Sequence, residues 1–262
     1  MLKRLTDLGP SEWIKETTDR IELDPERWDG NRINLCLPKI FASYAKIFHP
    51  IFEDLEVSDR SVSWNDLADH SPSEDPVDNF LHTSVTVYGG QMSDPTNLKR
   101  ISWQQLAKEQ GLTFHAELTT DTFTRNFRGK SWPRYLIGPE EGRLDDSDCH
   151  EVVKILSPLS NAIKCFFLYH SITTDDYESD WLFEGRLDDV FLARNVPGVH
   201  ASPTCWWPED RKWFVYTDYD LAFTLFAGDI ETIDTLVSNP NLECIRVEAG
   251  HRIDYRSDTI NP

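Results

Sequence analysis

The sequence contains no apolar run long enough to cross a membrane. Its longest candidate, residues 163–169, includes Lys164 and has only the length of a strand, whereas a membrane-spanning helix needs about 20 apolar residues. The N-terminus has a short positive start but lacks the apolar stretch of a secretory signal. We therefore expect a soluble, cytoplasmic protein that makes no contact with a membrane.

Signatures of the common catalytic and cofactor sites are also missing. There is no Gly-x-x-x-x-Gly-Lys phosphate loop, no Gly-x-Gly-x-x-Gly fingerprint, no Gly-x-Ser-x-Gly elbow and no His-Glu-x-x-His zinc helix. The five cysteines are widely spaced without a Cys-x-x-Cys pair, so we interpret them as buried free thiols. We predict no cofactor and no metal site, which favours a non-enzymatic function without excluding an enzyme.

Positive charge is scarce, and the imbalance is uneven along the chain. The sequence has 26 Lys and Arg against 45 Asp and Glu, a net charge of -19. Residues 139–262 hold 10 basic and 24 acidic groups, and residues 140–189 alone have a balance of -9. Phosphate backbones repel such a surface, so we expect no nucleic-acid partner, whereas a basic protein would be attracted to it. Alternatively, the acidity serves only the solubility of a bacterial cytosolic protein.

Hydrophobic spacing predicts several elements in the first half. Apolar residues recur at three- and four-residue intervals in 38–48, which predicts an amphipathic helix. Ser63 and Ser102 each precede a Trp-x-x-Leu segment and are predicted to cap short helices. The breaker-rich residues 71–76 predict a loop, and the alternating residues 83–88 predict a strand.

The second half predicts the order strand, helix, strand, strand, helix, strand, and the first of these helices begins at the acidic Asp145-Asp146 pair. This order indicates an α+β fold, a mostly antiparallel sheet with helices packed on one face. The expected organisation is an N-terminal arm (1–36), a helical or mixed subdomain (37–130) and an α+β subdomain (131–262), unless the chain is one continuous domain. The predicted strands are 132–137, 163–169, 213–216, 221–226 and 242–247, and the predicted helices are 146–156 and 229–237.

The most distinctive segment, residues 205–213, is rich in tryptophan. Trp206, Trp207 and Trp213 supply large rigid side chains that suit a planar ligand or a partner surface. The alternative is that they pack the core while the chain turns at Pro208, Glu209 and the following polar pair. In that case Asp210 and Arg211 form a local polar clamp.

Asp218 and Asp220 follow in an Asp-x-Asp pair. On an extended strand alternate side chains share a face, so both carboxylates could hold a hard cation such as Mg²⁺. Asp is also a common turn residue, and the pair lies between two apolar runs, which favours a turn.

These segments resemble the C-terminal part of a group of uncharacterised bacterial proteins that is frequent in actinobacteria. The resemblance covers about half of the chain, and it implies neither an activity nor a ligand because members of the group have none that can be carried over. It rests on Trp206-Trp207-Pro208, Asp210-Arg211, Trp213, Thr217-Asp218, Asp220-Leu221, Gly228, Ile233, Leu236 and Leu242-Glu243, and upstream on Pro38, Phe41, Tyr44-Ala45, His49-Pro50, Trp132, Arg134-Tyr135-Leu136 and Gly138-Pro139.

Three functional hypotheses remain. The leading one is a non-catalytic acidic binding protein, such as an immunity protein or antitoxin-like inhibitor, that docks on a basic protein partner. The second is a metal-assisted hydrolase that uses Asp218 and Asp220. The third is a small-ligand sensor that uses Trp206, Trp207 and Trp213.

Overall fold

The chain forms two compact units, each assembled from separate stretches of sequence. Unit 1 comprises Met1–His49 and Glu140–Ser257, and unit 2 comprises Pro50–Pro139 and Asp258–Pro262. The chain thus passes between units at 49/50, 139/140 and 257/258, whereas the sequence predicts boundaries at 36/37 and 130/131. The structure, a computed structural model, describes residues 1–19, 30–67, 94–127, 130–160 and 162–261.

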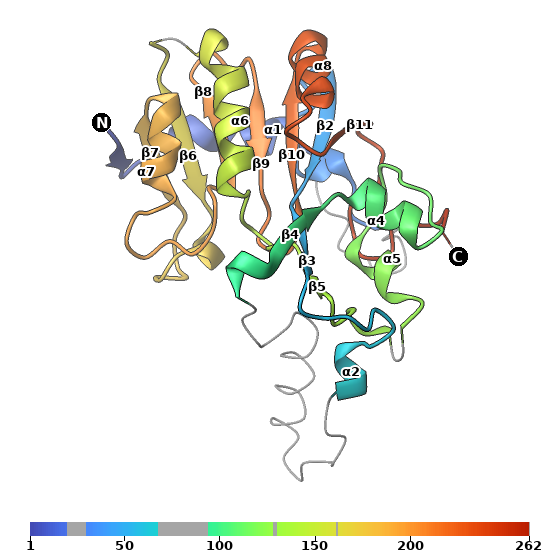
Figure 1. Ribbon diagram of the computed structural model, residues 1–262. Coiled ribbons are helices and arrows are strands. Elements are labelled where there is room, and N and C mark those ends of the chain that lie inside the picture. The colour runs from blue at the N-terminus through green and yellow to red at the C-terminus, as the bar shows by residue number, and fades with distance from the viewer. Residues whose placement is uncertain (20–29, 68–93, 128–129, 161, 262) are drawn as a thin grey trace. The chain divides into compact units, whose positions relative to one another are not determined.

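Unit 1 is built on an eight-stranded sheet in which all neighbouring strands are antiparallel (Figure 1). This confirms the predicted α+β class with a mostly antiparallel sheet. The strands in sheet order are β1 (Lys3–Leu5), β7 (Trp181–Gly185), β6 (Cys165–Tyr169), β8 (Cys205–Pro208), β9 (Phe214–Tyr216), β10 (Phe223–Gly228), β2 (Ser43–Phe48) and β11 (Cys244–Val247).

Both faces of this sheet are covered. The helices α6 (Asp146–Leu156), α7 (Val190–Ala193) and α8 (Ile230–Ser238) contribute side chains to one large apolar cluster on the first face. In Figure 1, α6 and α8 lie in front of the sheet and α1 (Glu12–Thr17) lies behind it. The first 36 residues, predicted to be a peripheral arm, supply strand β1 and the buried side chain of Trp13 in α1.

Helix α6 shows why the local prediction for 146–156 is confirmed. Asp145 caps the helix, since its side chain accepts a hydrogen bond from the Ser147 backbone N–H at 2.8 Å. Cys149, Val152 and Leu156 lie three and four residues apart and are buried against the sheet. The remaining elements predicted in the second half of unit 1 are found with shifts of a few residues.

Residues 38–48 do not form the predicted helix. Ser43–Phe48 is instead strand β2, which pairs with β10 on one side and β11 on the other. All its residues except Tyr44 are buried. A strand buried on both faces reads as a continuous apolar run, and helical spacing appears within such a run by coincidence.

Unit 2 contains a three-stranded antiparallel sheet and short helices. The helices predicted after Ser63 and Ser102 are confirmed, and the Ser102 hydroxyl accepts a hydrogen bond from the Gln105 backbone N–H at 3.0 Å. The predicted strand 132–137 is reduced to two residues, whereas the predicted loop 71–76 and strand 83–88 lie outside the described residues. The elements are β4 (Leu98–Ile101), β3 (Ile51–Asp54), β5 (Leu136–Ile137), α2 (Trp64–Leu67), α4 (Trp103–Glu109) and α5 (Thr120–Thr124).

Candidate functional site

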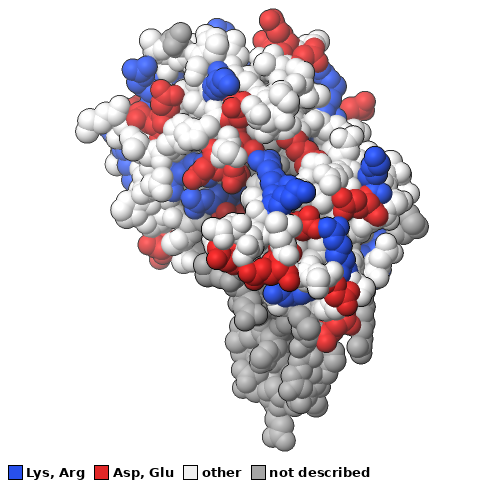
Figure 2. All heavy atoms as spheres, viewed as in Figure 1, with Lys and Arg blue, Asp and Glu red and all other residues white. Residues whose placement is uncertain are grey.

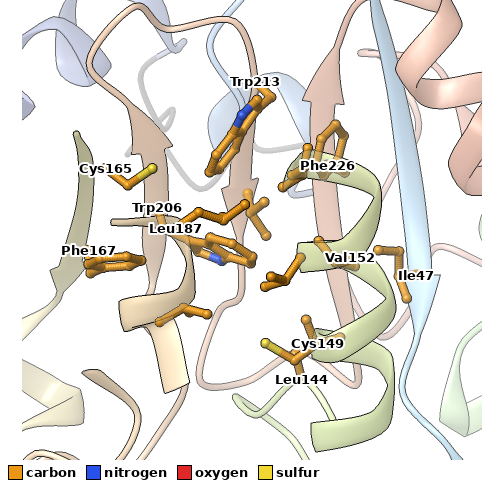
Figure 3. Packing of buried hydrophobic residues seen from close by; sticks show 14 of the residues in the cluster. Ile47, Leu144, Cys149, Val152, Cys165, Phe167, Leu187, Trp206, Trp213 and Phe226 are labelled. Carbon is orange, nitrogen blue, oxygen red and sulfur yellow. The ribbon is translucent and has the colours of Figure 1, made fainter. Parts of the chain in front are cut away.

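The tryptophan-rich segment lies in the core of unit 1. Trp206 and Trp213 point to the face covered by α6, where their rings meet edge to face at 5.5 Å (Figure 3). The Trp213 indole N–H donates to the Ser160 hydroxyl at 3.0 Å. Trp207, the next residue along β8, points to the opposite face and packs against Trp13 at 6.0 Å, as strand alternation requires.

The burial of these three indoles decides between the two interpretations of the segment. Trp206 and Trp207 are each 1% exposed, and Trp213 is 0% exposed. None of the three therefore offers a ring face to a ligand or a partner in this conformation. Their large apolar area stabilises the packing of the sheet against the helices on its two faces.

Asp210 and Arg211 form the turn between β8 and β9, as the core interpretation requires. The Arg211 backbone N–H donates to the Pro208 carbonyl at 2.9 Å, and Arg211 adopts a left-handed φ of 55°. Asp210 pairs with Lys212 at 3.0 Å, while the Arg211 guanidinium lies 4.8 Å from the Trp13 ring centre. The two residues thus make separate contacts and do not clamp one another.

Asp218 and Asp220 form the turn between β9 and β10. One carboxylate oxygen of Asp218 accepts a hydrogen bond from the Asp220 backbone N–H at 3.1 Å, which is a common way for Asp to stabilise a turn. The other accepts from the Tyr216 hydroxyl at 2.5 Å. The predicted turn is therefore present.

Both carboxylates line a cavity of about 530 Å³ in unit 1. Its walls come from four separate parts of the sequence, which only the fold brings together. They combine acidic groups with apolar and aromatic side chains, and this mixture is typical of a site that binds an amphipathic group. The lining residues are Asn31, Leu35, Cys36, Glu141, Tyr216, Asp218, Asp220, Leu221, Ile253, Asp254 and Tyr255.

The carboxylates of this acidic cavity differ in how far they are already neutralised. Asp254 is held by a two-pronged contact with Arg252, at 2.7 and 3.0 Å. Gly30 lies against this ion pair, where a Cβ atom would come within 2.5 Å of the Arg252 Nε. Among the described residues, no basic side chain pairs with Asp218 or Asp220. The negative charge that a ligand meets is therefore concentrated at the β9–β10 turn.

Cys36 and Tyr216 lie in the wall of this cavity but are not poised for catalysis. Burial raises the pKa of the Cys36 thiol to about 12, although a side-chain hydrogen bond with Tyr216 acts in the opposite direction. Burial also raises the pKa of Tyr216. Both groups are therefore protonated near neutral pH, so neither serves as a nucleophile or a general base.

The described residues contain no group of three or more His, Cys, Asp and Glu side chains placed to hold a metal ion. Asp218 and Asp220 lie next to one another in the cavity wall, but the hydrolase hypothesis needs further ligands around them.

Several carboxylates of the acidic stretch 140–189 are paired with basic groups. Most of these groups come from other parts of the chain, although Lys164 belongs to the stretch itself. Figure 2 shows acidic and basic side chains interspersed on the face in view. Sequence counting located the charge correctly along the chain but not in space, since it could not show these pairings. The pairs are Met1 amino group–Asp189, Lys3–Glu184, Arg4–Asp176, Lys164–Glu184, Arg194–Asp146 and His200–Asp175.

Of the seven predicted site residues, only Asp218 and Asp220 line the acidic cavity. Sequence reasoning missed Cys36, Glu141 and Asp254, because no motif or spacing links positions so far apart. Tyr216 had a weak signal, since alternation on a strand places residues 216 and 218 on one side.

In the part of the chain that the structure describes, no helix combines the length and apolarity required to span a bilayer. No protein-family model, no curated protein and no solved structure matches the chain.

Proposed function

We propose that this protein is a non-catalytic binding protein whose acidic cavity receives a positively charged group of a basic protein partner. The observation that carries the proposal is that Asp218 and Asp220 line a cavity without a basic counterpart among the described residues. Charges in a partly dehydrated cavity attract one another more strongly than charges in open water. The cavity therefore favours a cation over a neutral group of the same size.

The remaining walls suit a basic side chain rather than a bare ion. Leu35, Leu221 and Ile253 offer apolar surface to the methylene groups of a Lys or Arg stem. Tyr255 offers an aromatic face, and the Arg256 guanidinium already lies 5.1 Å from that ring centre.

The proposed role is that of an immunity protein or antitoxin-like inhibitor. A net charge of -19 attracts a basic partner over long range and speeds the encounter. The cavity would then supply the local contact that fixes the partner's position. A basic protein is therefore the partner class that fits best.

The binding proposal is tested with a minimal cationic probe. N-acetyl-arginine-N-methylamide is titrated into isotopically labelled protein at low salt, and the backbone amide shifts of residues 216–221 and 253–255 are followed by NMR. N-acetyl-glutamine-N-methylamide is the neutral probe. We expect saturable shifts for the arginine compound and none for the glutamine compound.

Matched variants locate the charge that binds. Asp218→Asn and Asp220→Asn should each weaken arginine binding by about threefold or more, since a partly exposed charge pair contributes on the order of 1 kcal/mol. Asp188→Asn removes the same charge from an exposed position outside the cavity and should leave binding unchanged. Equal binding of both probes, or an equal effect of all three variants, would overturn the proposal.

A further inference from the structure

A second cavity, of about 480 Å³, opens between α1 and the sheet of unit 1. We call it the α1 cavity. Its apolar lining comes from Leu8 and Ile14 at α1, from Leu35, and from Leu168 of the sheet. Leu8 is 37% exposed, so part of this apolar surface faces solvent.

The α1 cavity and the acidic cavity share a wall. Leu35, Cys36 and Tyr216 line both of them, and every other lining residue belongs to one cavity alone. All lining residues of both cavities lie in unit 1. A ligand that occupies one cavity therefore has the other directly across a wall of three side chains.

The charges of the α1 cavity argue against an anionic ligand. Lys15 is the one lysine or arginine in the lining, which also contains the acidic residues Glu12 and Asp180. His170 also contributes to the lining. The α1 cavity has no excess of positive charge, and the acidic cavity has a clear excess of negative charge. The negative charge of the acidic cavity would repel a carboxylate or a phosphate. A ligand that combines a cation with an apolar group would instead find a suitable surface for the cation in the acidic cavity and for the apolar group in the α1 cavity.

We infer that the two cavities together bind an amphipathic cation, namely a segment of the partner that carries a basic side chain and, within two residues, an apolar side chain. The basic side chain enters the acidic cavity, and the apolar one enters the α1 cavity. This inference rests on the proposed function and adds the apolar half of the recognised motif. The shared wall of Leu35, Cys36 and Tyr216 sets the short separation between the two side chains.

The test compares short peptides whose charge is constant. The probes are N-acetylated, C-terminally methylamidated Arg-Leu, Arg-Gly-Leu, Arg-Gln and Arg-Gly-Gln, and their dissociation constants are measured by NMR titration. We expect at least one leucine peptide to bind about tenfold more tightly than its glutamine counterpart, because the leucine side chain removes more apolar surface from water when it is buried. The leucine peptides should also shift the amides of residues 8–15.

Protein variants show whether the higher affinity of the leucine peptides arises in the α1 cavity. Leu8→Ala and Ile14→Ala should reduce the gain from leucine while leaving the Arg-Gln affinity unchanged. Ile230→Ala, on the exposed side of α8, is the matched control and should retain the full gain.

The outcomes separate the two proposals. If the leucine and glutamine peptides bind equally, the amphipathic motif is overturned and the cation-binding function stands. If no arginine peptide binds, the proposed function itself fails. A leucine gain that survives both Leu8→Ala and Ile14→Ala would place the apolar contact elsewhere and overturn the inference.

Discussion

His49 is a buried titratable residue of unit 1, with 0% exposure. Its Nδ1 lies 2.6 Å from the Glu140 carbonyl, and its Nε2 lies 3.0 Å from the Thr224 hydroxyl. The neutral ring satisfies both contacts, with Nδ1–H as donor and Nε2 as acceptor. Burial lowers the pKa of His49 from 6.5 to about 4, although the bond to Glu140 acts in the opposite direction.

We therefore expect acid to destabilise unit 1 through His49. The unfolded side chain binds a proton below about pH 6.5, while the folded one binds it only near pH 4. Stability is complete above pH 6.5 and falls as the pH drops from 6.5 to 4, by about 3 kcal/mol in total. Urea unfolding at several pH values measures this slope, and His49→Gln should remove it. The same slope in both proteins would contradict the assignment.

Two buried tyrosines offer a matched comparison of satisfied and unsatisfied hydroxyls. Tyr169 is 0% exposed, and its hydroxyl has no partner among the described residues. Tyr216 is also buried, but its hydroxyl donates to Asp218. Tyr169→Phe should raise the free energy of unfolding by about 1 kcal/mol, because an unpaired buried hydroxyl is unfavourable. Tyr216→Phe should lower it by about 2 kcal/mol, since it removes a bond to a charged group.

Urea unfolding at neutral pH measures both changes. A loss of stability in Tyr169→Phe would contradict the expectation and would indicate a water molecule bonded to that hydroxyl.

At the scale of elements, the sequence correctly predicted those helices and strands that are determined by interactions between residues close together in the chain. Helix α6 has a capping Asp145 and one apolar face, so its bounds were readable from the sequence. Strand β2 has neither signal, because its partners β10 and β11 lie more than 170 residues away in the chain. The acidic cavity has the same origin, since its walls meet only after those long-range pairings form.

Gly142 fixes the approach of one cavity wall to the β9–β10 turn. It has a φ of 70°, and a Cβ atom there would lie 2.8 Å from the Tyr219 Cα. Gly142→Ala should therefore destabilise unit 1 by roughly 1 kcal/mol for the left-handed backbone and by more for the clash. It should also weaken arginine-peptide binding, since Glu141 is displaced with it.

The matched control is Gly111→Ala. Gly111 has the same φ of 70°, but a Cβ atom there meets nothing within 4 Å. Thermal denaturation should show the smaller loss for this variant, and peptide binding should be unchanged. Equal losses for both variants would show that the contact with Tyr219 relaxes easily.

At the scale of the whole molecule, a net charge of -19 remains after every Lys and Arg has been counted against a carboxylate. Like charges repel in the compact state, and salt screens that repulsion over about 10 Å at 0.1 M. We expect the melting temperature to rise by several degrees between 10 and 300 mM NaCl, while binding of cationic peptides weakens. A melting temperature that falls with salt would show that the ion pairs dominate over the repulsion.

The division into two units was also beyond sequence reasoning. A segment-by-segment interpretation assumes contiguous domains, but unit 2 includes residues near position 258, where Asp258 accepts hydrogen bonds from Thr122 and His115. These hydrogen bonds join positions more than 130 residues apart, and no local sequence pattern predicts them.

The position of β2 in its sheet affects how the protein folds during synthesis. Phe48 pairs with Phe223, and Ile47 pairs with Cys244. On the ribosome, β2 therefore leaves the exit tunnel long before either neighbouring strand exists, and a strand that is almost entirely buried in the folded protein remains without its partners. Unit 1 can close only after residue 247 has emerged, and the acidic cavity is complete only after residues 253–255 of its wall have followed. Under the proposed function, binding of a partner therefore reports that synthesis has passed residue 255.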